Sequence, residues 1–246
     1  MSTLYQSKTV IATQGGGSPQ PLKAAKRSRY PLCNLYPDEQ EAVVAATAGP
    51  ASGLVTTVTN EIGLRFADGS EYRGDIKGKQ PHGKGTYIRP DLSYYNGEWA
   101  NGIAHGVGFE KYADGSTYRG EFVRGKRSGQ GAFVGRDYAY EGGWREGKMH
   151  GRGVLRRADG QVYTGEMADN FPQGSGCLQF PNGHRYEGDM ARGKCQGRGA
   201  LVLPSGARCV SDWKANVPVN AAVYHDGAGN AVLGQWVNGQ FVPKGA

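Results

Sequence analysis

The chain has 246 residues, 41 of them glycine, and a formal net charge of +7 with a pI of about 9.2. No apolar stretch reaches the roughly 18 residues that a membrane-spanning helix needs, and the N-terminus lacks the continuous apolar segment of a secretory signal. Cysteines at positions 33, 177, 195 and 209 form no Cys-x-x-Cys pair and fit no zinc template, so we expect reduced thiols in an intracellular compartment. The positive charge either favours an anionic partner or is simply that of a basic protein.

Residues 1–48 differ in composition from the rest of the chain. We expect an extended tail with a flexible joint at Gly15–Pro19 and a basic cluster at Lys23–Arg29. This cluster predicts a solvated segment or docking strap, with a nuclear or membrane-surface signal as the alternative. Residues 37–47 predict one short helix, because Pro37 suits a first turn and the acids after it complement the helix dipole.

From residue 72 onward a Tyr-x-Gly pattern returns every 22 or 23 residues. With this Tyr as position 0, glycines follow at positions 2, 11 and 13, and an apolar residue at position 4. Six clear copies span residues 72–208 and begin at Tyr72, Tyr95, Tyr118, Tyr140, Tyr163 and Tyr186. Residues 49–71 predict a degenerate first copy, and residues 209–246 predict degenerate C-terminal copies in which Ser211 replaces a glycine. A short fixed period predicts stacked units that each need their neighbours.

Each copy predicts a β-hairpin. Residues 95–99 alternate in the manner of a half-buried strand, residues 101–106 are rich in turn formers, and residues 107–112 supply the partner strand. Helix is disfavoured, because each glycine costs a helix about 1 kcal/mol. We therefore expect an all-β fold: an elongated, twisted, single antiparallel sheet of about 7–8 hairpins.

The rings at positions 0 and 4 predict ladders along this sheet, with glycines leaving bare backbone for the rings to cover. Ladder side chains offer large contact areas at low entropic cost, so we expect them to grip a partner helix or strand. The expected contact residues are Tyr72, Tyr95, Trp99, Tyr118, Phe122, Tyr140, Trp144, Tyr163, Tyr186, Trp213 and Trp236.

The segment from Tyr95 to Ser116 combines Tyr-x-Gly-x-Trp, Asn-Gly, His-Gly-x-Gly and Asp-Gly. This pattern resembles the MORN repeat (membrane occupation and recognition nexus) over residues 63–242. The resemblance implies a structural or adaptor protein of the cytoplasm and cytoskeleton, similar to MORN proteins of the ciliary or flagellar axoneme and its radial spokes. It implies partners within a large assembly, and a homodimer or heterodimer with another MORN protein as a further option. Some members carry a lipid kinase or lysine methyltransferase domain, for which we expect no room beyond about Phe241.

No residue pattern predicts catalysis. His82, His105 and His150 share position 10, which indicates a structural role, and no phosphate loop or nucleophile elbow is present. Acids recur at position 3 and predict an exposed ladder against basic side chains of neighbouring strands: Asp75, Glu98, Glu121 and Glu166. We expect no enzymatic activity, no cofactor, no metal and no nucleic-acid partner.

Basic residues gather in the third and fourth copies, and they predict a patch for an anionic surface: Lys126, Arg127, Arg145, Lys148, Arg152, Arg156 and Arg157. The alternative function is therefore a peripheral membrane adaptor that binds anionic phospholipids. A regulatory subunit of an enzyme is a third alternative.

Overall fold

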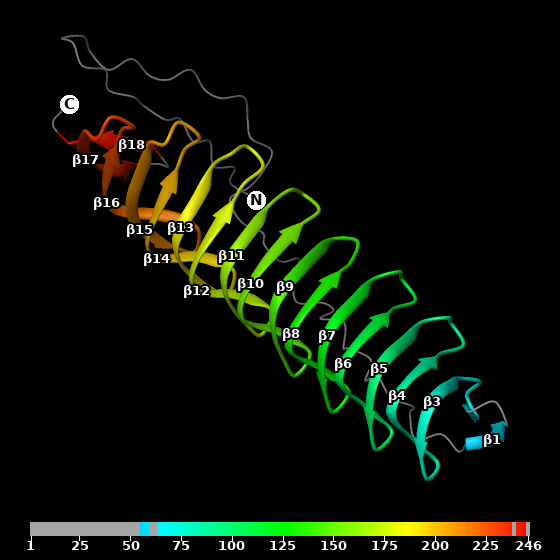
Figure 1. Cartoon of the computed structure of the whole chain (residues 1–246). Helices are drawn as coiled ribbons and strands as arrows, with labels where there is room; N and C mark the ends of the chain where they lie inside the picture. The colour runs from blue at the N-terminus through cyan, green and yellow to red at the C-terminus, as the bar shows by residue number, and fades with distance from the viewer. Residues whose placement is uncertain (1–54, 60–62, 238–239, 245–246) are drawn as a thin grey trace. The chain divides into compact units, whose positions relative to one another are not determined.

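The computed structural model describes residues 55–59, 63–237 and 240–244, and every regular element in these ranges is a β-strand. Figure 1 shows the strands following one another as curved hairpins in chain order. The expected all-β fold of consecutive antiparallel hairpins is confirmed. The expected N-terminal tail and the helix at 37–47 lie outside the described residues.

The chain divides into two compact units. The unit of residues 41–170 has strands that each pair antiparallel with the next. Its strands are β1 (Val55–Thr59), β2 (Gly63–Phe66), β3 (Glu71–Lys77), β4 (Gln80–Ile88), β5 (Tyr94–Ala100), β6 (Ile103–Lys111), β7 (Thr117–Val123), β8 (Lys126–Val134), β9 (Tyr138–Arg145), β10 (Lys148–Arg157) and β11 (Val162–Ala168).

The other unit begins at Phe171, and its strands pair in the same sequential antiparallel manner. They are β12 (Phe171–Gln179), β13 (Arg185–Ala191), β14 (Lys194–Val202), β15 (Arg208–Lys214), β16 (Val217–His225), β17 (Ala231–Val237) and β18 (Gln240–Pro243). In both units the within-copy turn and the turn between copies are short, as the Gly-rich and Asp-Gly signals predict.

The register of β5 against β6 defines the two faces of a copy. Tyr95 lies opposite Glu110, Gly97 opposite Gly108, and Trp99 opposite Ala104. Positions 0, 2, 4, 9, 13 and 15 therefore share one face, which we call the inner face, because side chains alternate along a strand. Positions 1, 3, 5, 8, 10, 12, 14 and 16 form the outer face. The register shifts between Gly97 and Trp99, so the second strand bulges near position 11, where Gly106 has a φ of 63°.

The inner face is the core. Tyr95 is fully buried, and a Cβ added to Gly108 would lie 2.4–2.6 Å from the ring and hydroxyl of Tyr95. Glycine at position 13 is thus what lets the ring lie against the backbone. The Tyr95 hydroxyl donates to the Glu98 carbonyl at 2.9 Å, and its ring meets Trp99 and Phe122 edge-on, with centroids 5.1 and 4.9 Å away.

The copy that starts at Cys209 differs from the other copies at three of these packing positions at once. Cys209 stands at position 0, Ser211 at position 2 and Ala222 at position 13, and all three are buried. The Ser211 hydroxyl donates to the carbonyls of Val219 at 3.0 Å and Ala221 at 3.4 Å, which are positions 10 and 12. In the first copy the Tyr72 hydroxyl contacts the carbonyls at these same two positions, at 3.3 and 3.4 Å. A serine hydroxyl therefore replaces the tyrosine hydroxyl, and the lost ring leaves room for an alanine.

Candidate functional site

The aromatic ladder lies inside the fold. Ten of the eleven residues expected to grip a partner are at most 5% exposed, and the last, Trp236, is half-buried. Their ring faces are covered by glycine backbone and by rings of adjacent copies, as where Tyr72 meets Trp99 at 5.2 Å. These side chains therefore hold the array together, and a partner laid on the sheet would contact other residues. This corrects the expectation that the ladder is itself a contact surface.

Burial also changes the chemistry of the ladder hydroxyls. It raises the pKa of Tyr72 to about 12, with the nearby Asp75 carboxylate adding to the effect. Burial likewise raises the pKa of Tyr140 to about 12. The ladder tyrosines therefore stay neutral and donate to backbone carbonyls, a structural role that leaves no activated oxygen for catalysis.

Two charged residues break the apolar pattern of the inner face. Glu110 occupies position 15 and is 1% exposed, and Arg127 occupies position 9 and is 7% exposed. The other clear copies carry apolar residues at position 15, namely Tyr87, Phe133, Leu155, Leu178 and Leu201. At position 9 they carry Pro81, Ala104, Met149, Pro172 and Cys195.

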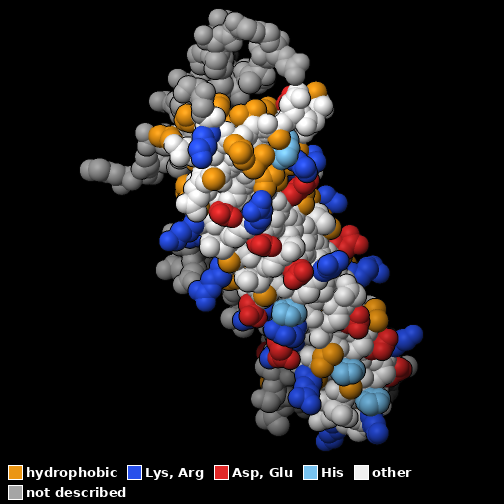
Figure 2. Space-filling model, turned by 90° about the vertical axis from the view of Figure 1, so that its left-hand side faces the viewer, with side chains coloured by type: hydrophobic (Ala, Val, Ile, Leu, Met, Phe, Trp, Pro, Cys, Tyr) orange, Lys and Arg blue, Asp and Glu red, His pale blue; other side chains and the backbone are white. Residues whose placement is uncertain are grey.

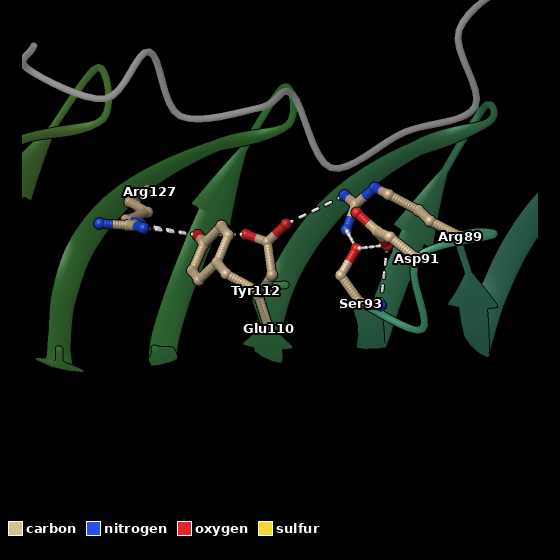
Figure 3. Close-up of polar contacts among 6 residues, drawn as sticks. All are labelled: Arg89, Asp91, Ser93, Glu110, Tyr112 and Arg127. Carbon is tan, nitrogen blue, oxygen red and sulfur yellow. Dashed lines mark hydrogen bonds and ion pairs between the residues drawn. The ribbon is translucent and has the colours of Figure 1, made fainter. Parts of the chain in front are cut away.

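A chain of polar contacts joins these two residues across neighbouring hairpins (Figure 3). Arg127 donates to the Tyr112 hydroxyl at 2.5 Å, and that hydroxyl donates to Glu110 Oε2 at 2.5 Å. Arg89 donates to the other Glu110 oxygen at 3.0 Å and to the Ser93 hydroxyl at 3.2 Å. The Arg127 guanidinium also lies 4.8–5.1 Å from four ring centroids, those of Tyr112, Tyr118, Phe133 and Trp144.

The network is closed, because the Glu110 carboxylate and the Arg127 guanidinium are each hydrogen-bonded within the fold. Buried charges of this kind contribute little net stability but are costly to break singly. Glu110 and Arg127 therefore tie the second and third clear copies together. Neither Arg89 nor Glu110 was expected from motif reasoning, although aligning the copies exposes Glu110 as the one charged residue at position 15.

The acids at position 3 serve the backbone of their own hairpins. Asp75 accepts the backbone N–H of Lys84 at 2.9 Å, and Glu121 accepts that of Gln130 at 2.8 Å. In both cases the donor is position 12, next to the bulge glycine. The expected charge ladder between neighbouring strands is therefore corrected at Asp75 and Glu121, where each carboxylate caps its own bulge.

The comparisons agree with this hairpin geometry. A family model described as the MORN repeat matches residues 72–94, 95–117, 118–139, 140–162, 163–185 and 186–208. The chain belongs to the MORN-repeat family. MORN repeats are a non-catalytic class that serves in protein interaction or membrane association.

Other comparisons add little. A search of curated proteins found no significant match. One similar solved structure is the SAS-4 (dCPAP) TCP domain in complex with a Proline Rich Motif of Ana2 (dSTIL) of Drosophila Melanogaster. It is 11% identical, the match covers 83% of this chain and 98% of that one, and the TM-score is 0.33.

The expected basic patch divides once the MORN copies are placed in register. Arg127 is buried, Lys126 pairs with Glu146 at 2.5 Å, and Lys148 lies 3.9 Å from Asp169. Arg157 is half-buried and lies 3.7 Å from Asp159. Arg145, Arg152 and Arg156 are exposed, as is Lys148, but no described carboxylate lies within ion-pair distance of these three arginines.

Two absences concern the described residues alone. Among them, no helix is long and apolar enough to cross a membrane. In the same part of the chain, His, Cys, Asp and Glu side chains form no group of three or more that could hold a metal ion.

Acidic and basic side chains are interspersed over much of the face that Figure 2 presents.

Proposed function

We propose that this MORN protein is a non-catalytic adaptor that holds a partner protein on the outer face of its sheet, within a cytoskeletal assembly. The observation that carries the proposal is a set of exposed apolar side chains on the outer face of β6–β8. Ile103, Val107, Val123 and Val134 are 44, 58, 42 and 56% exposed. Apolar side chains that are exposed on one face of adjacent strands can contribute to an interaction surface.

The inner face supports this choice by elimination. Apart from the half-buried Trp236, its ladder tyrosines and tryptophans are buried in the packing between copies, so a partner could reach these rings only by disrupting the array. The outer face keeps both apolar and charged groups available. For example, the Arg119 guanidinium lies 5.3 Å from the centroid of the half-buried Phe109 ring. Interfaces of this mixed composition are common between proteins.

The assembly that we propose is the ciliary or flagellar axoneme, in a role similar to that of radial-spoke MORN proteins. This placement rests on the family resemblance alone. A cytoplasmic, cytoskeletal location follows from the same resemblance.

Proximity labelling in the native cell tests the proposal. The wild-type chain is expected to label axonemal or other cytoskeletal proteins that resist detergent extraction. The double substitution V107D/V134D should lose those neighbours, while L233D, at a 63% exposed position of the other unit, should keep them. Labelling of phosphoinositide enzymes or other membrane proteins in place of cytoskeletal ones would refute the proposal.

The three exposed arginines support a second candidate, a peripheral adaptor for anionic membranes. Arginines near an anionic surface contribute about 1 kcal/mol each. The chain would then sediment with phosphatidylserine-containing vesicles and release on addition of salt. Sedimentation no greater than with neutral vesicles would remove this candidate.

A further inference from the structure

The fourth clear copy, which starts at Tyr140, lacks the acid at position 3 and has Gly143 there. In the three preceding copies this acid lies beside the bulge glycine. A Cβ on Gly83 would be 2.5 Å from Asp75 Oδ2, and one on Gly106 would be 2.2 Å from Glu98 Oε2. A Cβ on Gly151 would meet nothing within 4 Å. The outer face over Gly151 is therefore open where those copies seat a carboxylate of their own.

The chain cannot fill this place from position 3. A Cβ on Gly143 would lie 2.2 Å from the His150 carbonyl oxygen, so a side chain there would require the backbone to move. The backbone geometry at Gly143 therefore excludes an acid, and a change of side chain alone could not restore one.

One exposed arginine adjoins the open place, and two more lie farther away on the same outer face. Arg145 ends β9, Arg152 directly follows Gly151, and Arg156 lies farther along β10 on the same outer face. By register Glu166 lies opposite Arg152, and Glu141 lies opposite Val154. Neither carboxylate is within ion-pair distance of these arginines, so three exposed guanidiniums lack an internal counter-ion among the described residues.

We propose that the outer face around Gly151 binds carboxylates of an acidic segment of a partner protein. This inference deepens the proposed function and rests on it, since it takes the partner to be a protein. Carboxylate is favoured over phosphate because equivalent places in this same chain hold a carboxylate against the bulge, as Asp75 and Glu121 do at 2.9 and 2.8 Å from a backbone nitrogen. Guanidinium groups around it add bidentate contacts to further carboxylates.

The spacing of the arginines indicates the form of the partner. Arg152 and Arg156 are four residues apart on one strand, which places their Cα atoms about 13 Å apart. Two acids four residues apart in an extended segment match this distance. The expected ligand is therefore an extended chain with acids at intervals along β10.

The first test fills the open place from within. Gly151 has a φ of 69°, which Asp and Asn both tolerate, and the two side chains have nearly the same size. The probe is a fluorescein-labelled decaglutamate peptide, titrated with the full chain and followed by fluorescence anisotropy. G151D should weaken binding about fivefold by supplying an internal carboxylate, a loss of about 1 kcal/mol. G151N is the matched neutral control and should leave the affinity unchanged.

The second test separates this site from diffuse charge. R145Q/R152Q/R156Q should weaken decaglutamate binding about tenfold, or about 1.4 kcal/mol. R192Q/R198Q/R208Q removes three exposed arginines from the other unit and alters the net charge equally, and it should weaken binding no more than about twofold. Equal losses in the two variants, or equal effects of G151D and G151N, would overturn the proposal.

Two further arms identify the ligand source and the level of failure. Phosphatidylserine vesicles are titrated in parallel. If G151D weakens vesicle binding and the chain does not bind the peptide, the choice of a protein ligand is overturned. In the cell, G151D should reduce partner labelling while G151N does not. If wild type and G151D label the same cytoskeletal partner equally, the site is refuted and the adaptor function stands. If only the adaptor function fails, site-specific peptide binding persists while no cytoskeletal protein is labelled.

Discussion

Replacing Gly108 by Ala tests whether a buried tyrosine and the bare backbone beside it form one packing unit. The new Cβ would lie 2.4, 2.5 and 2.6 Å from the hydroxyl, Cε2 and Cζ atoms of Tyr95. The ring has little freedom to move, because Trp99 and Phe122 meet it edge-on at 5.1 and 4.9 Å. Overpacking of this kind costs about 1–3 kcal/mol and sometimes more. We expect the free energy of unfolding to fall by about 3 kcal/mol.

The copy at Cys209 shows which second change relieves this clash. There the ring is absent, and Ala222 occupies position 13 at 1% exposure. In a Tyr95→Cys background, Gly108→Ala should be neutral or stabilising by about 0.5–1 kcal/mol, because alanine restricts the unfolded chain more than glycine. The coupling between the two sites is therefore about 3 kcal/mol, well above the additivity error of distant sites. Tyr95→Phe should give no such relief, since the Cε2 and Cζ overlaps remain.

The measurement is urea denaturation of the full chain followed by tryptophan fluorescence, with m-values compared between variants. Gly115→Ala measures the cost of backbone strain without a steric contact, since Gly115 has a φ of 86° and a Cβ there would meet nothing within 4 Å. Gly108 has no positive φ, so its loss of stability should come from the ring contact. If Gly108→Ala costs the same in the wild-type chain and in the Tyr95→Cys background, the ring does not explain the glycine and the packing argument is wrong.

Three further predictions concern buried groups. Glu110→Leu should lower the free energy of unfolding, measured by urea denaturation, by about 3 kcal/mol, because it leaves buried cationic groups without their carboxylate. Adding Arg127→Met should recover most of this loss. A double variant no more stable than the single one would contradict the prediction. Because the folded pKa values of Tyr72 and Tyr140, about 12, exceed the ordinary 10, their stabilisation is complete below pH 10 and is lost as pH rises through 12. Tyrosinate absorbance should therefore rise together with unfolding, and full ionisation near pH 10 in the folded chain would be inconsistent with burial. Burial also raises the pKa of the Cys209 thiol to about 11, so a thiol reagent at neutral pH should label Cys209 only as the chain unfolds; rapid labelling of the native chain would refute this.

The hairpins were predictable because their signals are local. Alternation along residues 95–99, turn residues at 101–106 and the regular return of Tyr-x-Gly each act within one copy. The pairing of the ladder rings with glycines followed from the same period. The burial of these rings could not be predicted, because an alternating strand pattern does not show which face of the sheet the neighbouring copies cover.

The exceptions to the repeat carried the information that motif searching missed. Glu110 stands in an apolar position and Gly143 in an acidic one, and both are visible when the copies are aligned. Their consequences need the register. Only the structure connects Glu110 to Arg127 through Tyr112, and only the structure shows open space over Gly151.

That this protein is an array of β-hairpins could be predicted from its residues alone, because a period of about 23 residues with glycines at constant positions acts through short-range geometry. Which side chains are exposed and free to contact a partner depends on the tertiary structure. Seven basic residues of similar chemistry separate into a buried Arg127, three with acids nearby and three exposed arginines without one. That separation depends on which neighbouring strand covers or pairs each side chain, and covering and pairing are properties of packed copies, not of any one copy.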